Sequence, residues 1–224
     1  GFAYALYFRL IQRIGAARAA TVTYLVHEPV DKFEIFVDRG SIDAVTYDRD
    51  VISLKRHTFG YSSWLVDEPI DTLEDGVLHF EAHCRHTDYC TWDHMLELHP
   101  GVGFDVRYKT EAVLDFARID RDISAEFGYG RFGGSRLLAP NLMITADSAD
   151  VVVDFAAAPE AVTIDLGDGS VELAVPAGSY QCRVAAAVGE VTIADEVECD
   201  DAAAAVLDVQ LGSGDITVTA AAAP

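Results

Sequence analysis

A short strand–turn–strand unit recurs along this chain and limits what it can fold into. In each copy, apolar residues alternate with polar ones, a turn containing glycine follows, and the alternation resumes. The copies span residues 33–45, 162–175, 184–193 and 206–218. Glycine supplies the positive φ that a tight turn between strands needs. Because so small a unit cannot bury its apolar face alone, the copies must stack on one another.

This pattern predicts an all-β protein, built of repeats as a β-solenoid or as a stacked β-sandwich. Short alternating segments fill residues 21–220, and no convincing helical pattern interrupts them. We expect one β-repeat domain over residues 21–220, with a subdivision near residue 100 as the alternative.

The first 20 residues follow a different pattern. Leu6, Leu10 and Ile14 recur at helical spacing, and Arg9 and Arg13 lie together on another face. The segment is too short to span a bilayer and carries charge. We therefore expect a short N-terminal helix over residues 1–20, either docked on the β domain or the remnant of a membrane anchor or signal.

The charge of the chain excludes one class of partner. Its 37 Asp and Glu residues against 16 Lys and Arg residues give a formal net charge of −21. Binding to nucleic-acid phosphates needs a basic face. Nucleic acid is therefore not an expected partner.

The glycine turns admit a structural and a ligand-binding interpretation. "LGDGS" at 166–170 and "LGSGD" at 211–215 carry aspartates that could bind Ca²⁺ if several converged. No fixed acidic register repeats, and neither turn is followed by a helix or a lysine, as a phosphate loop would be. We expect structural corners, with Asp215 serving its turn, and no cofactor.

The sequence also shows no catalytic motif. A G-x-S-x-G elbow, an H-E-x-x-H motif and a dinucleotide fingerprint are all missing from it. Asp120 and Asp122 alternate as they would on one face of a strand, a placement that could suit glycoside chemistry. In so acidic a chain such pairs arise by chance, so we expect no enzyme and no catalytic residues.

Several long stretches carry a resemblance to a known family. They are "FEIFVDRGSIDAVTYDRDVISLKRH", "VLHFEAHCRHTDYC", "LELHPGVGFDVRY", "VTIDLGDGSVELAVPAGSYQCRVAAAVGEVTI" and "LDVQLGSGDITV". Over residues 21–220 this order resembles the putative adhesin family of envelope-associated β-repeat domains, which are largely of unknown function. The resemblance implies an exported or membrane-anchored, non-enzymatic protein and supplies no catalytic residues.

The four cysteines agree with an exported protein. An even count in such a protein indicates disulfides, and local pairing of Cys84 with Cys90 and of Cys182 with Cys199 is the simplest of three connectivities. Four reduced thiols in the core are the alternative for a cytosolic chain.

A cluster of histidines and cysteines offers a competing signal. His83, Cys84, His86, Cys90 and His94 lie close together, with His99 following, and imidazoles and thiolates at short spacing suit Zn²⁺. The spacing departs from that of zinc sites and Rieske clusters. We favour a disulfide with bystander histidines and keep a metal site as the alternative.

Taken together, these features predict a surface recognition or scaffold protein, extracellular or in the cell envelope, whose partners are proteins or envelope components. The alternative is an accessory subunit of a larger membrane or envelope protein complex, docked through the N-terminal segment and an aromatic group. That group comprises Tyr61, Trp64, Tyr89 and Trp92. A metal-binding domain built on the His and Cys cluster is the third hypothesis.

Overall fold

The computed structural model describes residues 20–26, 29–48, 52–60, 70–84 and 90–222. Within these residues the chain forms one 15-stranded mixed sheet and contains no helix, which confirms the all-β prediction. No segment of this part is a helix long and apolar enough to cross a membrane. The helix predicted over residues 1–20, with Leu6, Leu10 and Ile14, lies almost wholly outside the described residues.

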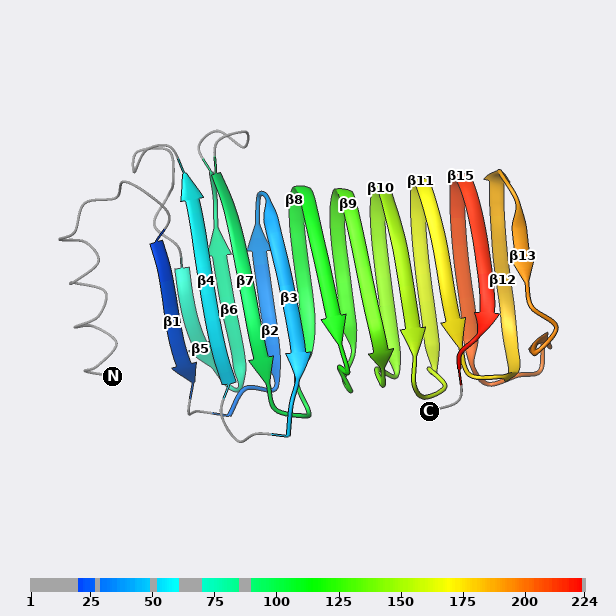
Figure 1. The fold of residues 1–224 in the computed structure, drawn as a ribbon, viewed down its shortest axis with the longest axis horizontal. Helices are drawn as coiled ribbons and strands as arrows, with labels where there is room; N and C mark the ends of the chain where they lie inside the picture. Colours follow the sequence, from blue (N-terminus) through cyan, green and yellow to red (C-terminus); the bar gives the residue numbers. More distant parts are fainter. Residues whose placement is uncertain (1–19, 27–28, 49–51, 61–69, 85–89, 223–224) are drawn as a thin grey trace.

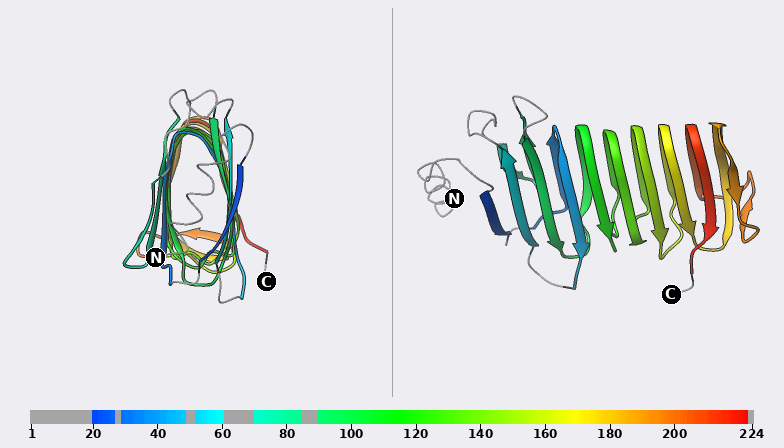
Figure 2. Two further views of the ribbon diagram at one scale, coloured as in Figure 1. Left: turned by 90° about the vertical axis from the view of Figure 1, so that its left-hand side faces the viewer. Right: turned by 45° about the horizontal axis from the view of Figure 1, so that its top comes forward.

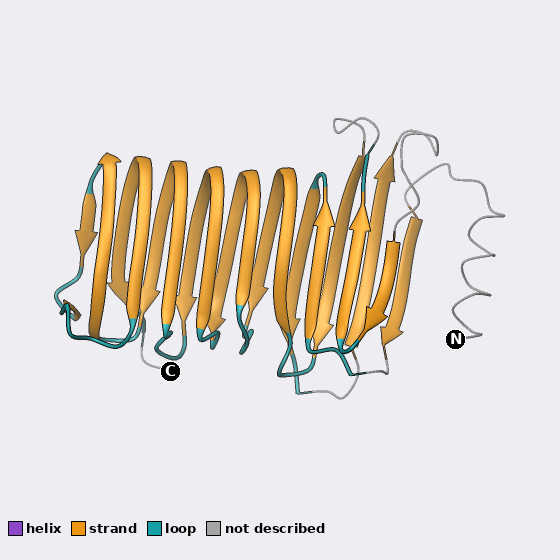
Figure 3. Ribbon diagram, turned by 180° about the vertical axis from the view of Figure 1, so that it is seen from behind, coloured by secondary structure: helices purple, strands orange, loops and turns teal. Residues whose placement is uncertain are grey.

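Five long strands form the middle of the molecule (Figure 1). They are β8 (Gly103–Ala117), β9 (Ile123–Leu137), β10 (Asn141–Phe155), β11 (Ala161–Val175) and β15 (Val206–Ala220). Each bends over near its middle, so its first half lies in one wall and its second half in the facing wall (Figures 1 and 3). We call these the first wall and the second wall, and one such passage through both walls a rung. Seen end-on, the rungs superpose as a flattened ring (Figure 2).

Toward the N-terminal end, each rung consists of two shorter strands. β2 (Lys32–Val37) and β3 (Gly40–Thr46) pair in parallel with the two halves of β8. β6 (Val77–Ala82) and β7 (Cys90–Leu98) pair in parallel with β2 and β3. Three antiparallel strands complete this end: β1 (Ala20–Val26), β4 (Ile52–Gly60) and β5 (Ile70–Glu74).

At the C-terminal end, β12 (Gly178–Val188) and β13 (Val191–Ile193) make the last rung, and β14 (Val197–Cys199) pairs with the start of β12. β15 lies between β11 and this rung, although it comes last in the chain. The rung of β6 and β7 likewise lies between that of β2 and β3 and the strands β4 and β5. At both ends, therefore, a later segment fills a position between two earlier ones.

The core lies between the two walls as columns of inward side chains. In β10 and β11 buried and exposed residues alternate along the first half of the strand, as the sequence pattern predicts. Parallel pairing in register then places equivalent residues of successive rungs above one another. One fully buried column consists of Val106, Ala125, Ile144, Ile164 and Val209. A single apolar cluster results.

Glycine allows the rungs to bend at closely stacked corners. Gly169 and Gly214 have φ values of 132° and 127°, and they lie opposite each other in β11 and β15. A Cβ on Gly214 would overlap the backbone carbonyl of Gly169. The carboxylate of Asp215 accepts a hydrogen bond from the Glu190 amide at 2.9 Å. The expected corner role of these turns is confirmed at Gly169 and Gly214.

Two disulfides join nearby parts of the fold. Cys84 is bonded to Cys90 between β6 and β7, and Cys182 is bonded to Cys199 between β12 and β14. These are the pairs that the sequence favoured. The first links the two strands of one rung, and the second fastens β14 to the last rung.

The corner geometry predicts that Gly214→Ala lowers the free energy of unfolding by about 3 kcal/mol, because a side chain is strained at this φ and also meets the neighbouring rung. Gly101→Ala is the control: φ is 92° there, but no atom lies within 4 Å of the added Cβ. Strain alone should then cost about 1 kcal/mol. Urea unfolding measures both, and equal losses would contradict a clash between rungs.

Candidate functional site

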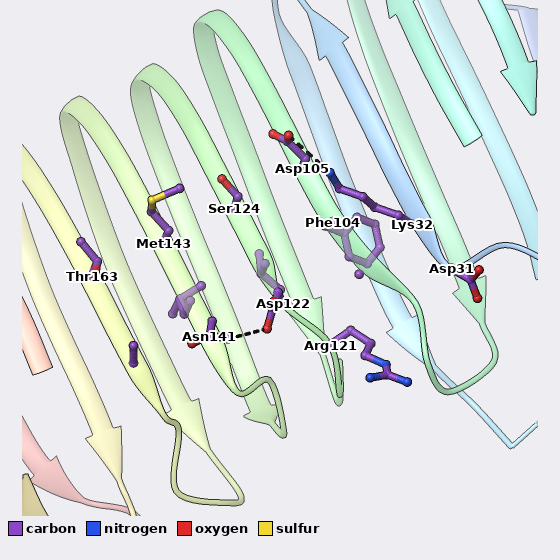
Figure 4. Close-up of a pocket in the computed structure, with 14 residues that line it drawn as sticks. Asp31, Lys32, Phe104, Asp105, Arg121, Asp122, Ser124, Asn141, Met143 and Thr163 are labelled. Atoms are coloured by element: carbon purple, nitrogen blue, oxygen red, sulfur yellow. Dashed lines mark hydrogen bonds and ion pairs between the residues drawn. The ribbon is translucent and has the colours of Figure 1, made fainter. Parts of the chain in front are cut away.

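A shallow groove crosses the first wall near the turns that join the rungs (Figure 4). Its volume is about 560 Å³, and it runs across β2, β8, β9, β10 and β11. The side chains that line it without being fully buried include Lys32, Asp105, Arg121, Asp122, Ser124, Asn141, Met143 and Thr163. The groove therefore runs along the stack, across the strands.

The floor of the groove contains one row of outward side chains. Asp105, Ser124, Met143 and Thr163 occupy the same register position on four consecutive strands. Neighbouring strands lie about 4.8 Å apart, so the row repeats at that spacing. Met143 is 50% exposed and adds an apolar surface between two hydroxyl groups. The row offers regularly spaced contacts to an extended ligand.

The two basic residues of the groove differ in their surroundings. Lys32 Nζ lies 3.0 Å from Glu34 Oε1 and 3.6 Å from Asp105 Oδ2, and the hydrogen bond to Glu34 raises its pKa. Arg121, in the turn between β8 and β9, extends along the edge of the groove, away from that ion pair (Figure 4). Arg121 is therefore the basic side chain that could meet an anionic group of a ligand.

The alternation of Asp120 and Asp122 predicted that both lie on one face of a strand. The structure shows that they do not. β8 ends at Ala117, and both aspartates fall in the turn before β9. Asp120 Oδ1 accepts a hydrogen bond from the Gly101 amide at 2.8 Å, and Asp122 Oδ1 accepts one from Asn141 Nδ2 at 2.9 Å. The two carboxylates thus connect neighbouring turns. Sequence alternation misleads here because it continues past the end of the strand.

The described residues of the predicted metal cluster have other contacts in the structure. Cys84 and Cys90 form a disulfide, so they offer no thiolate to a metal. His83 is half exposed and lies 3.0 Å from Glu81 and 3.5 Å from Asp38, and these carboxylates raise its pKa. His86 lies outside the described residues. Across the described ranges, no three His, Cys, Asp or Glu side chains are grouped to hold a metal ion.

His94 points into the core instead of toward the other members of that cluster. Its ring is 1% exposed and meets the edge of Phe80 at 4.8 Å. Arg56 lies over the same Phe80 ring at 3.8 Å and forms a bidentate ion pair with Asp71, at 2.7 and 3.0 Å. Burial, with the charge of Arg56 added, lowers the pKa of His94 to about 3. The imidazole is therefore neutral at pH 7.

The predicted interaction residues are only partly described. Trp92 is 2% exposed and packs against Phe80, with ring centroids 5.5 Å apart, so it belongs to the core and not to a docking surface. Trp92 lies two residues after the buried Cys90 on β7, so both side chains face inward. Aromatic composition alone could not indicate this. Tyr61, Trp64 and Tyr89 lie outside the described residues, as do Leu6, Leu10 and Ile14.

Sequence reasoning did not find the groove. Its residues come from five strands, and no local motif marks them. The signal that could have found them is the register: Ser124, Met143 and Thr163 lie about one rung apart, each one residue after an inward apolar side chain. Without knowing which strands pair, the sequence does not show that these residues share a row.

Comparisons with known proteins give limited likenesses. No family model matches the sequence, and no curated protein matches it. The chain is similar to a solved structure of a putative cell adhesion protein from Clostridium sporogenes, with 11% identity, a TM-score of 0.49, and coverage of 90% of this chain and 99% of that one. Putative adhesins from Bacteroides fragilis and Parabacteroides distasonis also share 11% identity, with TM-scores of 0.36 and 0.33 and coverage of 91% of this chain and 98% of each of theirs.

Burial of His94 predicts that acid destabilises the protein. The unfolded chain takes up this proton near pH 6.5, whereas folded His94 takes it up only near pH 3, so stability is lost as the pH falls between those values. From pH 7 to pH 4 the loss due to His94 is on the order of 3 kcal/mol. Urea unfolding measures the effect. Between pH 7 and pH 4, the free energy of unfolding of His94→Leu should fall by about 3 kcal/mol less than that of the native chain. His99→Gln is the control, and an unchanged pH dependence in His94→Leu would contradict the assignment.

Proposed function

We propose that this protein is a non-enzymatic recognition or scaffold protein of the cell envelope or the extracellular space, and that the groove on the first wall is its binding face. The observation that carries this proposal is the row formed by Asp105, Ser124, Met143 and Thr163 on four strands in register. Hydrogen bonding between the four strands fixes this row within the sheet. A preformed groove of this kind needs little reorganisation on binding.

We also propose that the stacked rungs form a β-solenoid and not a β-sandwich. In a sandwich, separate strands supply each of the two facing sheets. Here each long strand contributes to both walls, and the next rung pairs with it in parallel along both halves. This arrangement supports a repeat architecture in which neighbouring rungs are the main contacts.

Three features support the proposed location and the absence of catalysis. The two disulfides suit an oxidising compartment. The two aspartates that could have served glycoside chemistry instead accept hydrogen bonds from the Gly101 amide and the Asn141 side chain. The resemblance of the sequence to the putative adhesin family points the same way.

The ligand of the groove should be an extended chain with hydroxyl groups, such as a surface glycan. Ser124, Thr163 and Asn141 supply neutral hydrogen-bonding groups, Met143 supplies apolar contact, and Arg121 can pair with an acidic substituent. The many carboxylates nearby disfavour a polyanion, because a densely charged ligand would be repelled.

Thr163→Trp tests this proposal, because the large ring would fill the groove from an exposed position. We expect binding to a glycan array or to whole cells to fall at least tenfold while the melting temperature is retained. Thr217→Trp, the same change on the second wall, should leave binding unaltered. Equal binding by the two variants would refute the groove as the binding face. A pull-down from envelope fractions that returns one stoichiometric membrane partner would favour an accessory subunit instead.

A further inference from the structure

The last rung of the molecule has an outer edge that is only partly paired. β12 and β13 pair with β15 on one side. On the other side β14 pairs only with the start of β12. There the Gly178 amide donates to the backbone carbonyl of Glu196 at 3.1 Å, and the Asp200 amide donates to that of Tyr180 at 2.9 Å. Of the strands that the structure describes, none pairs with residues 181–193 on the side that faces away from β15 (Figure 1). We call this stretch the C-terminal edge.

The backbone of the C-terminal edge presents hydrogen-bonding groups outward. The Gln181 amide donates to the carbonyl of Ala205 at 2.7 Å, on the side of β15. Backbone groups of successive residues point to opposite sides of a strand. Those of Val184 and Ala186 therefore point away from β15, toward the position that β14 leaves. An edge of this kind is a template for a further strand.

The side chains of the C-terminal edge leave the core incompletely covered. Val184, Ala186 and Ile193 are only partly buried and pack against the core. Val188, at the corner, is 68% exposed. In β15, the neighbouring strand, the inward residues Val209, Leu211 and Val218 are at most 3% exposed. One more strand would give the last rung the same cover.

The N-terminal end of the stack is finished differently. There the antiparallel strands β4 and β5 bring Arg56 and Asp71 together across the core, with Arg56 lying over Phe80. The side chains of Arg56 and Asp71 are 5% and 10% exposed. At the N-terminal end a buried ion pair therefore lies between β4 and β5. At the C-terminal end the last rung covers the core with the partly exposed side chains of Val184, Ala186 and Ile193.

The charge around the C-terminal edge selects among occupants. Residues 177–205 contain a single basic side chain, Arg183, which lies 3.8 Å from Asp208. They contain six acidic ones: Glu190, Asp195, Glu196, Glu198, Asp200 and Asp201. The same end of a second copy would bring like charges together. A basic strand would meet complementary charge.

We infer that the C-terminal edge binds an extended strand of a partner polypeptide, with apolar residues at alternate positions and lysine or arginine at its ends. The partner strand lies beside β12, beyond the end of β14. It pairs with the outward backbone groups of Val184 and Ala186 and covers their side chains. Its basic ends face the acidic residues of the last rung. This is strand addition to a sheet edge, and it uses a surface separate from the groove.

A labelled peptide of alternating valine and threonine, with two lysines at each end, tests the inference by fluorescence anisotropy with the full chain. A matched peptide carries glutamates in place of the lysines. We expect the lysine peptide to bind at least tenfold more tightly at low salt, and the difference to shrink at about 1 M salt as screening shortens the range of the charges. Absence of binding by the lysine peptide, or equal binding by both, would overturn the inference.

Ala186→Pro identifies the edge as the site. Proline removes an outward amide and leaves the bonds to β15 intact, because proline is tolerated where the amide faces solvent. Affinity for the lysine peptide should fall at least tenfold, whereas Ala187→Ser, whose backbone faces β15, should bind as the native chain does. Unchanged affinity in Ala186→Pro would refute the edge.

A second variant keeps the test decisive if Ala186→Pro does not fold. In Glu196→Lys combined with Glu198→Lys, the affinity for the lysine peptide should fall and the affinity for the glutamate peptide should rise, each at least threefold. Changes in the opposite directions would count against the basic partner. Light scattering measures self-association of the native chain. A dimer that Ala186→Pro abolishes would assign the edge to a second copy and overturn the basic strand.

Discussion

Parallel pairing in register is the constraint on which the rest of this structure depends. It places equivalent residues of successive rungs directly above one another, so each inward position becomes a column that must be apolar throughout. The same rule applies at the corners, where Gly214 lies against Gly169 and neither tolerates a side chain without displacement. A one-residue slip would turn every inward side chain outward, so the register is strongly specified.

The same stacking governs where charge can be placed on the surface. Side chains of one outward column lie about 4.8 Å apart, so adjacent carboxylates would repel each other. In the column of Asp150, Ser170 and Asp215, a serine separates the two acids and donates a hydrogen bond to Asp150 at 2.7 Å. Farther along the stack, Arg131 pairs with Asp115 of the preceding rung. In these two columns, neighbouring carboxylates are thus separated by a serine or paired with an arginine.

A stack of rungs also has to end, and its two ends are built differently. At each end a later segment of the chain fills a position between two earlier ones, which makes the terminal rungs depend on contacts distant in sequence. The N-terminal end holds a buried ion pair of Arg56 and Asp71, and at the C-terminal end the disulfide between Cys182 and Cys199 fastens β14 to the partly paired strand β12. The groove and the C-terminal edge are therefore separate surfaces, one along the wall and one at the end.

The sequence by itself determined the all-β class, the inward and outward faces of the strands, the corner role of Gly169 and Gly214, and the pairs favoured for the two disulfides. These follow from alternation, turn chemistry and spacing, which are local properties of the chain. Only the tertiary structure decided which strands are neighbours. It placed β15 between β11 and β12, gathered Ser124, Met143 and Thr163 into one row, buried Trp92 and His94, and moved Asp120 and Asp122 into a turn. The physical reason is that alternating strands with similar apolar faces can stack in many orders, and the choice among them rests on long-range packing.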